Sequence, residues 1–189
     1  MTQHISDPEP DNLANKPDAV ARRARMRDFQ SQLAARMHAA RTGAQTQASL
    51  LGVMVGQTRC LLSLQEAGEI VPVGTIAPVP LTHDWFLGLT NVRGNLVSVI
   101  DLARFQGMAS TQLDKDGRIV VFSPALTINS GLLVSRVMGL RNITEMQEQD
   151  SPVEAPWIAK RYIDRESTVW NELNLLSIVQ DPKFLQVGI

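Results

Sequence analysis

The feature that most constrains the fold is a series of short apolar runs at close spacing, separated by residues that favour turns. Residues 49–64 read SLLGVMVGQTRCLLSL, which predicts strands at 49–55 and 59–64 joined by a turn at Gly56. Three more runs of this kind follow without long helical patterns between them: GRIVVFSP (117–124), INSGLLVS (128–135) and RVMGLRNI (136–143). Such a pattern is typical of barrels or sandwiches rather than of a parallel α/β sheet.

The connecting segments show turn and loop chemistry. The three prolines in residues 70–81 predict a bent edge or an irregular connection, and THDWF (82–86) predicts a helical turn capped by Thr82. LARFQGM predicts a short helix that ends at Gly107. Toward the C-terminus we expect a loop in the acidic segment 144–157, a strand around 168–170 and a short helix in LNLLSIVQ (173–180).

The N-terminal quarter of the chain differs from the rest in composition and in its pattern of apolar residues. Residues 1–16 are rich in Asp, Asn and Pro without periodicity, which predicts disorder. Residues 17–42 predict an amphipathic helix, because apolar residues recur in steps of three and four: Met26, Phe29, Leu33, Met37 and Ala40. This stripe either packs on the chain's own domain or binds another protein. The remaining residues, 43–189, are expected to form one domain.

Composition excludes several classes of function. The chain of 189 residues has a net charge of −1, which gives no support for nucleic acid as a partner. No apolar run approaches the roughly 18–20 residues of a membrane span, so we expect no membrane insertion. The polar N-terminus does not resemble a secretory signal, and the expected location is cytoplasmic. The single cysteine, Cys60, lies in an apolar run and is expected to be a small buried hydrophobe.

A search for catalytic chemistry finds no motif. The histidines His4, His38 and His83 stand in separate contexts without metal-ligand spacing. No phosphate-binding loop and no Gly-x-Ser-x-Gly motif is present. We therefore expect no metal, no cofactor and no enzymatic activity. A small ligand- or nucleic-acid-binding β-barrel stays open as an alternative, although the aromatic content of 5% is low for base stacking.

The most conspicuous polar feature is the centre of GLTNVRGNLVSVIDL (88–102). Gly94-Asn95 predicts a tight turn between two strands, which places Arg93 beside the turn with an exposed guanidinium. Asn91 and Gly94 are expected to supply turn geometry and backbone hydrogen bonding. Asp101 is expected to cap the short helix that follows. A β-rich chain with one such turn and no catalytic motif is typical of proteins that bind other proteins.

Residues 75–107 resemble the signature of CheW-like domains. In that family a Pro-containing segment is followed by a glycine, the tetrapeptide Asn-aliphatic-Arg-Gly and Ile-Asp-Leu, which here are Gly88, residues 91–94 and residues 100–102. The resemblance extends more loosely over residues 49–180. Three positions depart from the family pattern, where Pro or Asp is usual: Ser98, Ser135 and Asn174. The arginine-rich N-terminal segment and the C-terminus are similar to the PilI type of pilus-linked systems.

The resemblance implies a mainly β fold with flanking helices, in which two small five-stranded SH3-like barrels share a core. It also implies a non-catalytic adaptor that couples a methyl-accepting chemoreceptor to a CheA-type histidine kinase, in arrays at the membrane that control type IV pilus twitching motility. The kinase would dock on the first barrel, and the cytoplasmic tip of the receptor would lie in the groove between the barrels. A protein that competes for the adaptor position, rather than bridging both partners, would resemble the family equally.

The resemblance also implies a role for Arg93. The family has an acidic residue near this arginine, which makes Glu69 the expected ion-pair partner. An exposed pair of this kind contributes only about 0–1 kcal/mol to folding, so its expected value is to preorganise a docking surface. Ile70, Val71 and Leu89 are expected to supply the apolar part of that surface.

Overall fold

The structure is a computed structural model and describes residues 49–150 and 155–189. These residues belong to a compact unit, Gln45–Ile189. The predicted disordered segment 1–16 and the predicted amphipathic helix 17–42 lie outside the described residues. Within the described part of the chain, no helix has the length and apolar character needed to cross a membrane.

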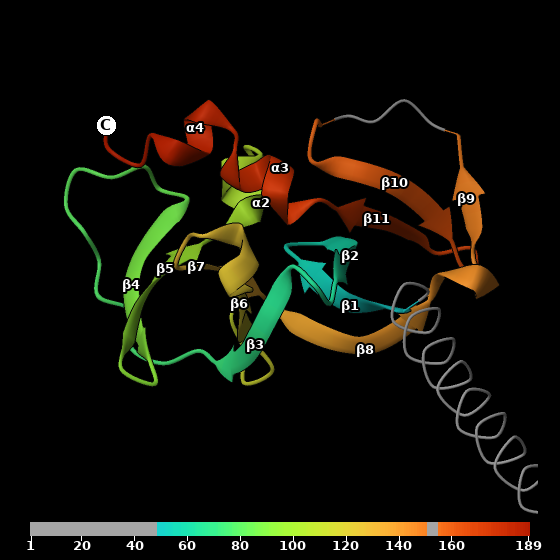
Figure 1. Cartoon of the computed structure of the whole chain (residues 1–189), viewed down its shortest axis with the longest axis horizontal. Helices are drawn as coiled ribbons and strands as arrows, with labels where there is room; N and C mark the ends of the chain where they lie inside the picture. The colour runs from blue at the N-terminus through green and yellow to red at the C-terminus, as the bar shows by residue number, and fades with distance from the viewer. Residues whose placement is uncertain (1–48, 151–154) are drawn as a thin grey trace, which may run out of the picture. The chain divides into compact units, whose positions relative to one another are not determined.

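The first of two sheets, which we call the first barrel, is formed by the middle of the chain (Figure 1). Its strands are β3 (Ala67–Pro72), β4 (Phe86–Val92), β5 (Asn95–Ile100), β6 (Arg118–Phe122) and β7 (Ser130–Val134). They are ordered β3-β6-β7-β5-β4, so that β3 and β4 are the edges. Strands β5 and β7 are parallel, and the other neighbours are antiparallel.

The second sheet, the second barrel, combines the start and the end of the described chain. Its strands are β1 (Ser49–Val55), β2 (Thr58–Ser63), β8 (Arg136–Asn142), β9 (Gln147–Gln149), β10 (Ile158–Ile163) and β11 (Val169–Leu173). They are ordered β8-β1-β2-β11-β10-β9. The first barrel is thus inserted between β2 and β8. The prediction of two small barrels is confirmed, except that β9 gives the second barrel a sixth strand.

Many strands are apolar on both faces because each barrel packs in two directions. In β1, Val53 is part of a core that both barrels share. Leu50, three residues earlier in the same strand, packs inside the second barrel with Trp170. In β6, Val120 faces the shared core and Ile119 packs inside the first barrel. The shared core therefore joins the two barrels, as the resemblance implied.

Short helices cover one end of this core (Figure 1). They are α2 (Leu102–Phe105), α3 (Leu175–Val179) and α4 (Pro182–Leu185), with the 3-10 turn η1 (Pro124–Leu126) next to α3. A second 3-10 turn, η2 (Ile143–Glu145), joins β8 to β9 in the second barrel. The Trp85 ring packs edge-on to Phe105 at 5.1 Å between centroids and stacks on Phe184 at 5.8 Å. These aromatic contacts attach α2 and α4 to the first barrel.

Three local predictions were wrong. THDWF forms a turn without a helix, in which the Phe86 amide donates to the His83 carbonyl. The Thr82 hydroxyl donates back to the Val79 carbonyl, so it caps nothing. The segment 144–157 is not all loop, since it contains β9, and strand β10 was not expected at all.

Candidate docking site

The turn between β4 and β5 consists of Arg93 and Gly94. Their φ values are +50° and +90°, and Val92 pairs directly with Asn95 across the hairpin. Two residues of positive φ are the pattern of a type I′ hairpin turn. The turn was predicted one residue too late, at Gly94-Asn95. Arg93 is therefore part of the turn, in a backbone conformation that non-glycine residues rarely adopt.

The Asn91 side chain stabilises this turn. Its Oδ1 atom accepts a hydrogen bond of 2.8 Å from the backbone N–H of Gly94. Asn91 thus contributes a hydrogen-bond acceptor to the turn, and Gly94 contributes a donor and a residue of positive φ. The arrangement holds the Arg93 backbone from both sides and leaves its side chain outside the barrel.

The expected ion pair between Arg93 and Glu69 is present. The Arg93 Nη2 atom lies 2.7 Å from Glu69 Oε1, with the side chains 80% and 35% exposed. Because Glu69 is on β3 and Arg93 follows β4, the pair connects the two edge strands of the first barrel. Exposure at this level limits its contribution to stability to about 0–1 kcal/mol.

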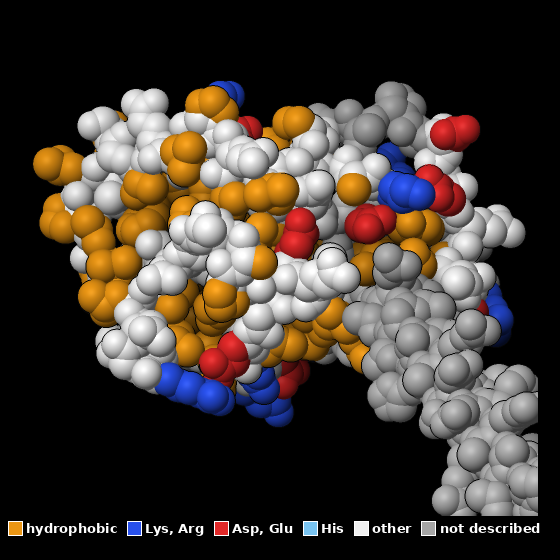
Figure 2. Space-filling view, in the orientation of Figure 1, with side chains coloured by type: hydrophobic (Ala, Val, Ile, Leu, Met, Phe, Trp, Pro, Cys, Tyr) orange, Lys and Arg blue, Asp and Glu red, His pale blue; other side chains and the backbone are white. Residues whose placement is uncertain are grey.

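An open groove lies between these two edge strands. Its volume is about 430 Å³, and it is lined by residues 69–72, Gly74 and residues 90–93. Ile70 is 41% exposed, so it offers apolar surface to a partner. Figure 2 shows basic and acidic side chains next to each other at the lower edge of the first barrel, with apolar side chains above them. The groove thus combines a directional ion pair with apolar surface.

The other predicted apolar residues take different positions. Val71 lines the groove but also packs toward the interior of the first barrel with Ile119 and Leu133. Leu89 does not line the groove, and its backbone exchanges two hydrogen bonds with Ala77, of 2.8 and 2.9 Å. The structure therefore brings Glu69, Ile70, Val71 and Arg93 together and leaves Leu89 apart from them.

Gly88 is required where the β3–β4 connection crosses β4. Its φ is +127°, and a Cβ atom there would collide with the carbonyl oxygen of Ala77. The strand pairing shifts by one residue between Phe86 and Gly88, which is a β-bulge. Gly88 consequently has a structural role, as expected for this part of the motif.

Asp101 is a helix cap, as predicted, and has a second role that was not predicted. Its carboxylate accepts from the Ala103 N–H at 3.1 Å, and also from the N–H and hydroxyl of Thr111 at 2.9 and 2.7 Å. The Thr111 oxygen in turn accepts from the Gly56 N–H, in the turn between β1 and β2 of the second barrel. This buried network links the two barrels beside α2.

The three departures from the family pattern are accommodated locally. Asn174 caps α3, with its side chain accepting from the Ser177 N–H at 2.8 Å. The Ser98 N–H donates to the Asn129 carbonyl, a bond that proline could not make. The Ser135 N–H donates to the Met54 carbonyl. None of them disrupts the fold.

The single cysteine and the candidate metal ligands are the other groups that could have a functional arrangement. Cys60 is buried in the shared core, and burial raises the pKa of its thiol to about 12. Across residues 49–150 and 155–189, no group of three or more His, Cys, Asp or Glu side chains is arranged to hold a metal ion.

Comparison with known families settles the class of this domain. Residues 49–183 match the model of the CheW-like domain. The chain belongs to the CheW-like domain family. This CheW-like chain is 27% identical over 144 residues to Protein PilI of Pseudomonas aeruginosa, a match that covers 74% of the chain and 79% of PilI.

Other relatives agree with this placement. The Thermotoga maritima chemotaxis protein CheW is 28% identical over 78 residues, which is 41% of this chain and 50% of that protein. The solved structure of the scaffolding protein TtCheW from Thermoanaerobacter tengcongensis superimposes with a TM-score of 0.59. That match covers 68% of this chain and 84% of TtCheW at 20% sequence identity, so it supports the fold.

Proposed function

We propose that the chain is a non-catalytic adaptor that couples a methyl-accepting chemoreceptor to a CheA-type histidine kinase. Its membership of the CheW-like family and its similarity to chemotaxis proteins support this function. The similarity to PilI supports a pathway that controls type IV pilus twitching motility. In this role the protein is cytoplasmic and is recruited to chemosensory arrays at the membrane.

The observation that carries the proposal is the Glu69–Arg93 pair over an open groove. An exposed ion pair contributes little to folding, but it strengthens when a partner removes water from it. The pair is held by a tight turn and by a β-strand, so little side-chain freedom is lost when a partner binds. Ile70 and Val71 add apolar surface beside it. We place one partner, the kinase, on this surface, and the receptor tip between the barrels.

The test is a pull-down with the full chain from cells that contain the chemosensory system. Wild type is compared with Arg93→Glu, which repels Glu69, and with the double variant Glu69→Arg/Arg93→Glu, which restores the pair with exchanged charges. The matched control is Lys160→Glu, because Lys160 forms a comparable exposed pair with Glu148 at 2.9 Å on the second barrel. Circular dichroism checks that every variant is folded.

We expect wild type and Lys160→Glu to recover both a histidine kinase and a chemoreceptor. Arg93→Glu should lose at least one of them by tenfold or more. If the double variant regains part of this binding, the ion pair acts by orienting the docking surface. If binding is still lost, the partner requires the positive charge at position 93 itself. Normal recovery by folded Arg93→Glu would contradict the role of Arg93. Recovery of neither partner by wild type, together with saturable binding of a small molecule or an oligonucleotide, would favour the alternative of a ligand-binding barrel.

A further inference from the structure

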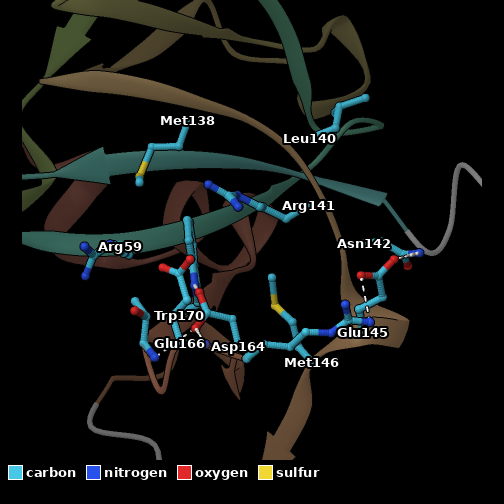
Figure 3. A pocket seen from close by; sticks show the side chains of 12 residues that line it. Arg59, Met138, Leu140, Arg141, Asn142, Glu145, Met146, Asp164, Glu166 and Trp170 are labelled. Atoms are coloured by element: carbon cyan, nitrogen blue, oxygen red, sulfur yellow. Dashed lines mark hydrogen bonds and ion pairs between the residues drawn. The ribbon is translucent and has the colours of Figure 1, made fainter.

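The second barrel carries a separate pocket (Figure 3). Its volume is about 430 Å³, and strand β2, strand β8, η2 and the β10–β11 turn line it. The lining residues that matter here are Arg59, Met138, Leu140, Arg141, Met146 and Trp170. This pocket is formed by other strands than the groove at Arg93, and it does not contain any residue of that groove.

Arg141 is held in place within this pocket. Its guanidinium carbon lies 5.0 Å from the centroid of the Trp170 ring, a cation–π contact. Gly52 makes room for this arrangement, since a Cβ atom there would stand 3.1 Å from the Trp170 ring and 3.2 Å from Arg141 Cγ. The indole itself is fixed, because its Nε1–H donates to Asp164 Oδ2 at 2.9 Å. Arg141 is thus preorganised before any partner arrives.

Two of the three arginines that line the pocket, Arg141 and Arg59, have donors without an acceptor among the described residues, whereas Arg165 pairs with Glu145. The Nε atom of Arg141 is buried and has no hydrogen-bond partner, which is an unfavourable state for a buried donor. Arg59 is exposed and forms no ion pair within residues 49–150 and 155–189. In Figure 3 it lies on the side of the pocket toward which the Arg141 guanidinium points. The cluster therefore offers positively charged donors to a ligand.

The acidic side chains of the pocket are mostly engaged elsewhere. Both oxygens of Asp164 accept hydrogen bonds from its own turn, from the N–H groups of Glu166 and Thr168 and from the Trp170 indole. Glu145 pairs with Arg165 at 3.3 Å. Glu166 is exposed on the turn. The pocket is formally neutral. The Trp170 hydrogen bond, the turn amides and the nearby Arg141 charge lower the pKa of Asp164, so Arg141 has an anion close by, whereas Arg59 forms no ion pair with a side chain that the structure describes.

Apolar side chains stand beside the arginines. Met138, Leu140 and Met146 line the pocket, and Leu140 is 62% exposed. Arg and Met are among the residue types enriched at protein interfaces. We propose that this pocket binds an acidic side chain of a partner protein, with the carboxylate between Arg59 and Arg141 and an adjacent apolar side chain against Leu140. This docking site on the second barrel is independent of the surface at Arg93.

The experiment follows the donor atoms themselves by NMR of the full chain. The Nε–H signal of Arg141 and the indole N–H signal of Trp170 are recorded during titration with a capped tripeptide, acetyl-Leu-Glu-Leu-amide. The matched probe is acetyl-Leu-Gln-Leu-amide, and inorganic phosphate is a third. Variants Arg141→Gln and Arg59→Gln are compared with Lys160→Gln, since Lys160 does not line the pocket. The exposed Arg59 position keeps a test available if Arg141→Gln does not fold.

We expect the Glu peptide to shift both signals saturably, and the Gln peptide to bind at least tenfold more weakly. Arg59→Gln and Arg141→Gln should weaken Glu-peptide binding by tenfold or more, while Lys160→Gln binds as wild type does. The proposal is overturned if the Glu and Gln peptides act alike, if only phosphate shifts the signals, or if the arginine variants bind normally. It is also overturned if raising the protein's own concentration alone produces the shifts, because a second copy would then fill the pocket.

Discussion

Gly88 lies directly against the carbonyl group of Ala77, with no room for a side chain between them. A Cβ atom at Gly88 would collide with the Ala77 oxygen and would stand 2.8 Å from the Ala77 carbonyl carbon and 2.9 Å from the Pro78 Cα. All of these atoms belong to backbone, so none can move aside as the end of a side chain could. The glycine therefore determines how closely the β3–β4 connection crosses β4.

Gly88→Ala should destabilise the fold by about 2–5 kcal/mol, because it adds a backbone collision to an unfavourable positive φ. The control is Gly94→Ala, where φ is +90° but no atom lies within 4 Å of the new Cβ. That variant should lose only about 1–2 kcal/mol. Urea denaturation followed by tryptophan fluorescence measures both. Equal losses in the two variants would show that the close approach to Ala77 is unimportant.

Asn91→Ala should cost about 0.5–1.5 kcal/mol, because the Gly94 N–H loses its acceptor in the turn. Asn95→Ala is the matched control, since Asn95 is also exposed and begins β5 across the same turn. We expect a change within about 0.5 kcal/mol for that variant. Thermal unfolding of the two proteins under identical conditions compares them. A larger loss at Asn95 would mean that the amide at 91 does not fix the turn.

Asp101→Ala should destabilise the protein by about 2–4 kcal/mol, because three donors from Ala103 and Thr111 lose their acceptor, and Asp101 is only 1% exposed. Asp181→Ala removes the cap of α4 instead, where the hydrogen bond to Lys183 is exposed. That control should cost about 0.5–2 kcal/mol. Chemical denaturation gives the two free energies, and a smaller loss for Asp101→Ala than for Asp181→Ala would contradict the linking role of the buried network.

The Cys60 thiol should not react with a thiol reagent such as DTNB at pH 8 until the chain unfolds. Burial raises its pKa from 9.0 to about 12, so the reactive thiolate is suppressed in the folded state. The associated contribution to stability is fully present below pH 9 and is lost as the pH rises toward 12. Ala109→Cys, which adds a thiol at an exposed position, is the control and should react at once with one equivalent. Rapid reaction of native Cys60 would contradict its burial.

Much of the first barrel could be predicted because its strands carry local signals. The runs that became β6 and β7 are continuous apolar stretches bounded by turn residues, and the structure shows that both of their faces are buried. Strand β10 gave no such signal. Lys160 and Arg161 stand side by side in it, and its strand conformation comes from pairing with β11 and β9, which are tertiary contacts.

The docking surface was predictable only in part. The pairing of Glu69 with Arg93 was expected from the family resemblance, and the positions along β3 and β4 do not reveal it by themselves. Leu89 was expected in the surface because it is near Arg93 in the sequence, but it pairs with Ala77 of the β3–β4 connection and does not line the groove.

The pocket around Arg141 could not be found from the sequence. Its residues come from β2, β8, η2, β11 and the β10–β11 turn, which only the sheet order brings together. Its decisive element is the missing side chain of Gly52, which admits Arg141 above Trp170. A glycine within a strand indicates that another part of the protein or a ligand lies close to the backbone there, but the sequence does not identify which residue that is.

The insertion of the first barrel between β2 and β8 has a consequence for synthesis on the ribosome. The hairpin of β1 and β2 emerges early, but its neighbours β8 and β11 are made only after the whole first barrel. The parallel pairing of Cys60 in β2 with Asn171 in β11 can form only after β11 has been synthesised. The first barrel can therefore close while the nascent hairpin still exposes apolar side chains, and the last stretch of translation joins the two halves into one cooperative unit.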